Sequence, residues 1–400
     1  MENQLRKTIS DNLLNATEKH FVLELSTGVG KSKLALDKIS QLYSPDAKIL
    51  IVIPRNVLIQ NWIDEFKKWH YEDMLNNVTF VTYVSLPKMA GYWDICCFDE
   101  CHHLSERCRE ALTSFHIEHA LFLSATISKD VRYFINYQYN KYEELKWIKV
   151  GTKKAIENNV LPDPEIILYP ILLDNTKADL LYSPKKIKEG KSFITVPYKE
   201  RWLYKKSKKP YKIQCTQLQY YNELSGIIDW YKRKAFQPIM KNMWLHKAGE
   251  RLKWLAEQKL SVVKDIIKAL KNRRAIVFCG SIDQSKHLGV PCVNSEVGIN
   301  SLTKFNEGKV DIISCVGMLD EGANLNNCQV GIFDMLNSSE KLQVQRIGRI
   351  LRHKHPVIVI PYFKNTRDEE ILKKMLEGYN SNHIFVIDSI IGIINKIKNL

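Results

Sequence analysis

The sequence predicts an α/β protein whose parallel sheets are flanked by helices, and three observations lead to this prediction. Short apolar runs typical of buried strands, such as 49–53, alternate with segments of helical spacing. Several runs carry polar residues at their carboxyl ends, where parallel sheets gather ligand groups. With 400 residues, 45% of them hydrophobic, the chain is long enough for two or three domains with separate cores.

The expected elements alternate along the chain. A helix is expected over 55–69, because Leu58, Trp62 and Phe66 repeat at helical spacing. In the first half, apolar runs predict buried strands over 21–25, 49–53, 79–84, 93–98 and 121–123. In the second half we expect strands over 166–173 and 357–362 and helices over 259–270 and 368–378.

The stretch around which the chain is organised is 26–32, with the sequence S-T-G-V-G-K-S, between the first strand and a helix. A strand, a glycine turn and a helix start line up backbone N–H groups around a phosphate. Lys31 would add a point charge and Ser32 a Mg²⁺ ligand, which predicts a nucleoside triphosphate pocket. The alternative is an ordinary turn at a helix start. The predicted pocket residues are Thr27, Gly28, Val29, Gly30, Lys31 and Ser32.

An acidic pair supplies a second phosphate-site element. Asp99 and Glu100 follow the apolar strand over 93–98, and His102 comes next. Phosphoryl transfer needs a metal bridge to the phosphate oxygens and a group that orients the attacking water. We expect Asp99 to hold Mg²⁺ together with Ser32, and Glu100 to position or deprotonate the water. An acidic pair alone is usually just a loop, but its place behind a strand, after a glycine loop, favours the catalytic interpretation.

The net charge of +15 is concentrated in one segment. Residues 174–259 contain 20 Lys or Arg and 8 Asp or Glu, a net charge of +12. Aromatic residues such as Trp202, Tyr211 and Trp230 lie among them. This composition suits a polyanion whose bases can stack on aromatic rings. The alternative is a solvated helical face with the aromatic residues in a core.

Hydropathy and cysteine usage argue against a membrane-spanning, secreted or disulfide-bonded protein. No apolar run reaches the roughly 20 residues that span a bilayer, and the N-terminus has no signal-peptide apolar region, so we expect an intracellular soluble protein. The nine cysteines lack framework spacing, which argues against disulfides. Cys101, His102, His103 and Cys108 could form a metal cluster, but their spacing does not match that of tetrahedral zinc sites.

Seven motifs in family order make the chain resemble the superfamily 2 helicases of the DExH type. T-G-V-G-K-S (27–32) is similar to motif I, P-R-N-V-L-I-Q-N-W (54–62) to motif Ia, D-E-C-H (99–102) to motif II and S-A-T (124–126) to motif III. The second half continues with A-I-V-F-C-G-S (275–281), V-G-M-L-D-E-G-A-N-L (316–325) and Q-V-Q-R-I-G-R-I-L-R (343–352), which resemble motifs IV, V and VI. Each motif alone is weak, and their order makes the resemblance specific.

The resemblance implies two RecA-like domains that face each other across one ATP. Arg349 and Arg352 match the motif VI arginines, which approach the γ-phosphate from the second domain. Gln345 matches the glutamine near the nucleotide and the attacking water. The expected links between the nucleotide and the domain interface are His102, Ser124, Thr126 and Gly322, the last also in the nucleotide site.

The resemblance also implies a nucleic-acid track across both domains. Family members hold the phosphate backbone largely through main-chain N–H and small polar groups, so we expect low sequence specificity. The matching residues are Pro54, Arg55, Asn56, Tyr83, Ser85, Gly280 and Ser281.

The positions of the motifs, four in the first half of the chain and three in the second, predict the domain organisation. We expect one RecA-like domain over 1–158 and a second over 159–400, joined near L-P-D-P (161–164). The basic aromatic segment, about 174–258, is expected to be an insertion in the second domain, where such proteins commonly contact nucleic acid. Ile9 stands where the family has an adenine-reading glutamine, so the preference for ATP rests on the resemblance alone.

We therefore expect an ATP- and Mg²⁺-dependent motor acting on single-stranded or forked DNA. DNA is favoured over RNA because D-E-C-H and E-G-A-N-L resemble the branch of XPB, UvsW and RadD type proteins. The compact chain suggests a viral or phage-encoded enzyme. Two alternatives remain: a double-strand translocase or annealing motor that does not unwind, and a nucleotide-switched binding module without turnover.

Overall fold

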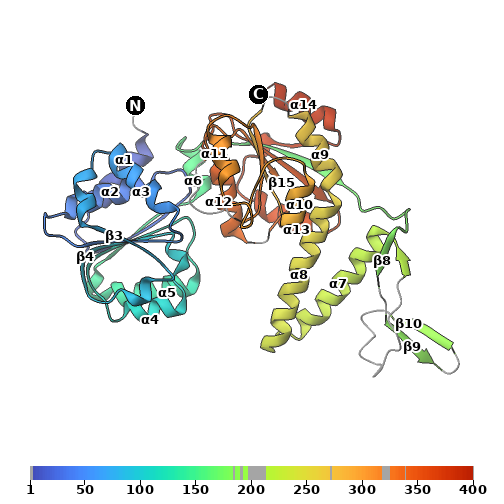
Figure 1. The fold of residues 1–400 in the computed structure, drawn as a ribbon, viewed down its shortest axis with the longest axis horizontal. Helices are drawn as coiled ribbons and strands as arrows, with labels where there is room; N and C mark the ends of the chain where they lie inside the picture. The colour runs from blue at the N-terminus through green and yellow to red at the C-terminus, as the bar shows by residue number, and fades with distance from the viewer. Residues whose placement is uncertain are drawn as a thin grey trace.

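The computed structural model describes residues 3–182, 185–189, 192–196, 213–270, 273–317, 325–337 and 339–399. Two α/β domains with parallel sheets lie next to each other, and a pair of helices projects from the second (Figure 1). The predicted fold class is confirmed.

The first domain is a six-stranded parallel sheet with the strand order β3-β2-β4-β5-β1-β6. This order places the carboxyl ends of β4, β5 and β1 side by side, which brings the acidic pair, the S-A-T motif and the glycine loop to one edge. Helices α1, α2 and α3 pack on one face and α4 and α5 on the other (Figure 1). The strands are β1 His20–Leu25, β2 Ile49–Ile53, β3 Val78–Thr82, β4 Tyr92–Asp99, β5 His116–Ser124 and β6 Leu145–Val150. The helices are α1 Gln4–Leu14, α2 Lys31–Leu42, α3 Leu58–Lys68, α4 Glu106–Leu112, α5 Lys129–Tyr139 and α6 Thr152–Glu157.

The second domain is a seven-stranded sheet with the order β13-β14-β12-β15-β16-β7-β17, whose neighbouring strands are all parallel. Helices α9 and α14 pack on one face, and α11, α12 and α13 on the other. The strands are β7 Glu165–Ile171, β12 Ala275–Phe278, β13 Cys292–Val293, β14 Ile312–Cys315, β15 Val330–Phe333, β16 Val357–Phe363 and β17 Ile384–Val386. The helices are α9 Leu260–Ala269, α10 Ile282–His287, α11 Asn300–Asn306, α12 Glu340–Ile350, α13 Arg367–Leu376 and α14 Ile390–Lys398.

The described part of the segment between β7 and α9 contributes no strand to the parallel sheet. Its described strands pair antiparallel with each other, β8 with β11 and β9 with β10. Its helices α7 and α8 form a long hairpin that projects from the second domain (Figure 1). The bounds are β8 Leu180–Tyr182, β9 Lys185–Glu189, β10 Ser192–Val196, β11 Ile213–Cys215, α7 Gln217–Arg233 and α8 Pro238–Gln258.

Candidate nucleotide site between the two domains

The glycine loop turns sharply between β1 and α2. Gly28 and Gly30 have φ of +93° and +110°, in the left-handed region that favours glycine. Gly30 is the N-cap residue of α2, so the first turn of this helix directs its backbone N–H groups toward the loop. The Lys31 ammonium donates to the Leu25 carbonyl oxygen across the loop, at 3.0 Å. The loop therefore has the geometry of a phosphate cradle.

The acidic pair lies within electrostatic reach of this loop. Burial lowers the pKa of Lys31, and the charges of Glu100 and Asp99 oppose that shift. Burial and the neighbouring Glu100 raise the pKa of Asp99 to about 6. A hydrogen bond in which Trp62 Nε1 donates to Asp99 Oδ2 at 3.0 Å opposes this rise. Glu100 has a φ of 51°, which turns the chain away from β4 directly after Asp99. A lysine and two carboxylates thus share one buried site.

His102, Ser124 and Thr126 are brought together beside Glu100. The Ser124 hydroxyl donates to the Thr126 carbonyl at 2.7 Å, so the hydrogen bond to His102 Nδ1 at 2.9 Å has the imidazole as donor. His102 Nδ1 also lies 3.3 Å from Glu100 Oε2. A polar chain therefore runs from the acidic pair to the end of β5, by an ion-pair distance from Glu100 to His102 and a hydrogen bond from His102 to Ser124.

Helix α12 brings the second domain against the glycine loop. A Cβ atom built on Gly348 would lie 2.5 Å from Thr27 Cβ, so the helix backbone touches the loop directly. Gln345 and Arg349, on the same helix, are 1% and 4% exposed. The charges of Arg349 and Arg352 both act on Lys31, lowering its pKa. The guanidinium groups of one domain and the lysine of the other thus converge on one place.

Buried polar atoms at this interface fit a triphosphate. Within the described residues, Thr27 Oγ1 and both amide atoms of Gln345 are buried without a hydrogen-bond partner. Buried polar groups normally have partners, so these atoms point to a polar ligand between the domains. Ser32 and Asp99 offer the oxygen ligands that Mg²⁺ prefers. The residues present therefore fit ATP and Mg²⁺.

A cavity of about 1200 Å³ opens beside the loop. Arg6 of α1, Gly28, Leu161 of the interdomain segment, Arg352 and Tyr379 are among the residues that line it. Its size exceeds that of ordinary small-molecule pockets, which leaves room for a base and ribose next to the phosphate loop. Ile9 is 2% exposed in the core of the first domain, so its side chain does not face a ligand.

The expected nucleic-acid residues of the first domain fall into two groups. Arg55 and Asn56 are exposed and Pro54 is half-buried, directly after β2. Ser85 is half-buried in the turn after β3. Tyr83 differs from these residues, because its ring is 6% exposed and its hydroxyl donates to the Asp99 carbonyl at 2.7 Å. Its side chain supports the acidic pair from the core and offers no surface to a strand.

In the second domain, Gly280 and Ser281 form the turn between β12 and α10. A Cβ on Gly280 would lie 2.3 Å from Met335 Sδ, so glycine allows close packing there. Ser281 caps α10 by accepting from the Gln284 backbone N–H at 3.1 Å. Both residues are half-buried at the carboxyl end of β12. Gly322 lies outside the described residues.

Two contacts at the site were not predicted. Trp62 holds Asp99, although its spacing with Leu58 and Phe66 predicted only a core position. Gly348 seats the second domain on Thr27, and a glycine inside a helix is the one sequence signal that marks it.

The fold and the site together define a class of protein, the ATP-dependent nucleic-acid motors with two RecA-like domains. Residues 2–129 match the family described as "Type III restriction enzyme, res subunit", and residues 258–354 match "Helicase conserved C-terminal domain". The chain belongs to the superfamily 2 helicases, ATP-hydrolysing enzymes that act on nucleic acid.

One sequence relative and two solved structures show what the chain is similar to. It is 24% identical over 389 residues to "DNA 3'-5' translocase XPB2" of Sulfurisphaera tokodaii, covering 90% of this chain and 81% of that protein. Its fold is similar to that of S. cerevisiae Dbp5 bound to RNA and ADP BeF3, with a TM-score of 0.64, 10% identity, and coverage of 99% and 93%. It is also similar to the Pyrococcus furiosus Hef helicase domain, with a TM-score of 0.51, 13% identity, and coverage of 92% and 97%.

Within the described residues, no helix is long and apolar enough to cross a bilayer. All nine cysteines are free thiols, as expected.

Proposed function

We propose that this helicase is an ATP-driven DNA translocase that separates strands at forked DNA. The observation that carries the proposal is the approach of α12 to the glycine loop, where Gly348 touches Thr27 and the charges of Arg349 and Arg352 reach Lys31. Phosphoryl transfer requires cationic groups around the transferred phosphate, and here the two domains bring them to one buried site. DNA is favoured by the name of the XPB2 relative, which aligns with 90% of this chain.

In the proposed mechanism each domain supplies part of the catalytic site. The loop N–H groups and Lys31 would bind the β- and γ-phosphates, while Ser32 and Asp99 would hold the metal. Bound Mg²⁺ would neutralise the charge that develops on the phosphate oxygens. Glu100 orients the attacking water and accepts its proton, with Gln345 beside it.

The second domain stabilises the transition state. Arg349 and Arg352 offer guanidinium groups to the γ-phosphate, and an arginine finger of this kind increases turnover by about 10³-fold or more. Because these arginines belong to the second domain, closure of the domains is needed before ATP is hydrolysed. Hydrolysis then weakens the contact and lets the domains separate.

The polar chain from Glu100 through His102 and Ser124 to Thr126 links the nucleotide to the domain interface. Thr126 lines a second cavity, of about 760 Å³, together with Gln343 and Arg367 of the second domain. A change in the contacts of Glu100 on hydrolysis would therefore alter the contacts of Thr126, where the two domains meet. The turns with Arg55 and Asn56 in one domain and Gly280 and Ser281 in the other would grip the backbone of one strand, and relative domain movement would advance it.

A DNA-stimulated ATPase assay tests this function. Phosphate release should rise several-fold with single-stranded DNA, less with duplex DNA and least with RNA. A chain that binds ATP but releases no phosphate with any of the three would be a nucleotide-switched binding module instead.

A second candidate is a double-strand DNA translocase that does not unwind, which the word "translocase" in the name of the relative favours. A strand-displacement assay on a forked duplex and a triplex-displacement assay on a blunt duplex distinguish the two. Triplex displacement without strand displacement would identify the translocase.

A further inference from the structure

The turn of the α7–α8 hairpin exposes a cluster of large apolar side chains. Phe236 is 81% exposed and Ile239 73%, and Met243 and Leu245 follow on the next turns of α8. Such side chains usually lie in a core or against a partner when they gather in one place. We call residues 230–247, which include these four, the hairpin tip.

The charge of the hairpin tip indicates the chemistry of its partner. Residues 230–247 contain five Lys or Arg and no Asp or Glu. Lys232, Arg233 and Lys241 are exposed, and Lys234 Nζ lies over the Trp230 ring, 4.1 Å from its centroid. Apolar side chains inside a uniformly basic surface match nucleic acid, which presents phosphates outside and base faces between them.

The half of the hairpin next to the second domain is held together by side-chain contacts. Contacts join its two helices at successive levels, from Gln217 Nε2 with Gln258 Oε1 at 3.1 Å to Arg251 Nη1 with Ser225 Oγ at 2.9 Å. Between them the rings of Tyr220 and Trp254 lie 5.0 Å apart. The two helices are therefore joined from the second domain up to the level of Ser225 and Arg251.

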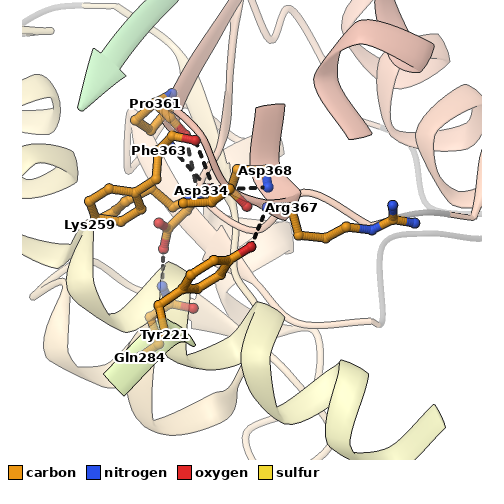
Figure 2. Close-up of polar contacts among 9 residues, drawn as sticks. Tyr221, Lys259, Gln284, Asp334, Pro361, Phe363, Arg367 and Asp368 are labelled. Atoms are coloured by element: carbon orange, nitrogen blue, oxygen red, sulfur yellow. Dashed lines mark hydrogen bonds and ion pairs between the residues drawn. The ribbon is translucent and has the colours of Figure 1, made fainter. Parts of the chain in front are cut away.

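The base of the hairpin is anchored in the second domain by buried polar contacts (Figure 2). Lys259, between α8 and α9, donates to Asp368 Oδ2 at 2.9 Å and to the Pro361 carbonyl at 3.2 Å, and both charged residues are at most 1% exposed. Tyr221 of α7 accepts from the Arg367 backbone N–H at 2.8 Å. Any motion of the second domain is therefore passed to the hairpin tip.

The buried contacts of Lys259 also lie close to the turn with Gly280 and Ser281, which is proposed to bind nucleic acid. Gln284 accepts from the Gly280 N–H at 2.8 Å and donates to Asp334, whose carboxylate is close enough to Lys259 for their charges to interact (Figure 2). From there the hairpin projects away from α14 (Figure 1). The hairpin tip thus stands beyond the turn that would hold the strand.

We propose that the hairpin tip is a wedge that enters a base step at the junction between duplex and single strand. Phe236 and Ile239 insert between the bases, and Lys232, Arg233 and Lys241 bind the flanking phosphates. Apolar side chains of these types unstack base steps in other nucleic-acid complexes. This inference rests on the proposed function, because the motor supplies the movement that drives the wedge through a duplex.

Junction opening can be measured without ATP hydrolysis. A forked DNA with 2-aminopurine at the first base pair should gain fluorescence when the wild-type protein binds. Phe236→Ala should lower that gain by about tenfold, the effect of losing one stacked aromatic ring. Phe236→Tyr, which keeps the aromatic ring, should restore most of it. Tyr137→Ala, at a similarly exposed ring on α5, is the matched control and should behave as wild type.

Strand displacement with ATP completes the test. Phe236→Ala should displace strands about tenfold more slowly than wild type while keeping its phosphate release on single-stranded DNA. Equal junction fluorescence and equal displacement in Phe236→Ala and wild type would overturn the wedge, as expected if the hairpin tip binds a protein instead. A wild-type protein that opens the junction but hydrolyses no ATP would refute the proposed function and leave the wedge supported.

Discussion

Gly348 of α12 and Thr27 of the glycine loop are in direct contact, although they belong to different domains. A side chain at position 348 would place its Cβ atom 2.5 Å from Thr27 Cβ and 3.2 Å from Thr27 Oγ1. Real Cβ atoms do not approach this closely, so only glycine allows the helix to rest on the loop. The closed arrangement of the two domains depends on this contact.

Gly348→Ala should therefore reduce ATP turnover. The added methyl group moves α12 away from the loop and displaces Arg349, and a misplacement of about 1 Å in a catalytic group can cost about 10²-fold in rate. Steady-state phosphate release at saturating ATP measures the effect. Gly249→Ala is a matched control, because a Cβ on Gly249 meets no atom within 4 Å. If both variants turn over ATP at the wild-type rate, the contact does not support catalysis.

Lys31→Ala and Glu100→Gln should each abolish turnover and leave DNA affinity unchanged. The first removes the ammonium group inside the glycine loop, and the second removes the proposed base while keeping the shape of the side chain, for which a loss of about 10²- to 10⁴-fold is expected. Phosphate release and DNA binding by fluorescence anisotropy give the two readings. Normal hydrolysis by either variant would refute the assigned role.

Arg352→Ala should reduce kcat far more than ATP binding. A group that acts only in the transition state lowers turnover by about 10³-fold without a comparable change in nucleotide affinity. A fluorescent ATP analogue measures the binding. Losses of equal size in turnover and affinity would show that Arg352 binds the ground state and is not a finger.

Asp334 should make the protein less stable as pH rises from about 4 to 7. Burial raises the pKa of Asp334 to about 7, with the charge of Asp368 adding to the rise and that of Lys259 opposing it. Between the unfolded pKa of about 3.9 and the folded value, the folded state binds a proton that the unfolded state lacks, so stability is lost over this window. The loss amounts to about 4 kcal/mol at most.

Urea unfolding at pH 5 and pH 8 measures this loss. Asp334→Asn keeps an acceptor for Gln284 and cannot titrate, so its unfolding free energy should fall less between the two pH values than that of wild type. An identical fall in both proteins would mean that Asp334 titrates normally in the folded state.

Much of the fold was predictable because buried parallel strands are continuous apolar runs. The strand expected over 166–173 is β7, Glu165–Ile171, and the helix expected over 368–378 is α13, Arg367–Leu376. The strand expected over 79–84 ends earlier, at Thr82, and the hydroxyl of the next residue, Tyr83, donates to the carbonyl of Asp99 at the end of β4. A contact between distant segments decides that boundary, and local sequence does not contain it.

The sequence predicted the catalytic motifs of the candidate site, but it did not predict the contacts that hold those motifs in place. The glycine loop, the acidic pair and the arginines of α12 are short motifs with a chemical reason for each residue. Trp62, Tyr83 and Gly348 act through contacts that the fold creates. Helical spacing predicted only a core position for Trp62, and the resemblance predicted a nucleic-acid contact for Tyr83. Lys259 is a similar case. In the sequence it is one of many cations in a basic segment, whereas in the structure it is fully buried and anchors the hairpin through Asp368.

The central claim is that the two domains complete one ATP site, and phosphate release by Arg349→Ala tests it most directly. This variant keeps the loop, Lys31 and the acidic pair of the first domain intact. With saturating single-stranded DNA and ATP, we predict that it loses about 10³-fold or more in turnover and still binds ATP. Hydrolysis at the wild-type rate would mean that the first domain acts alone, which would contradict the account.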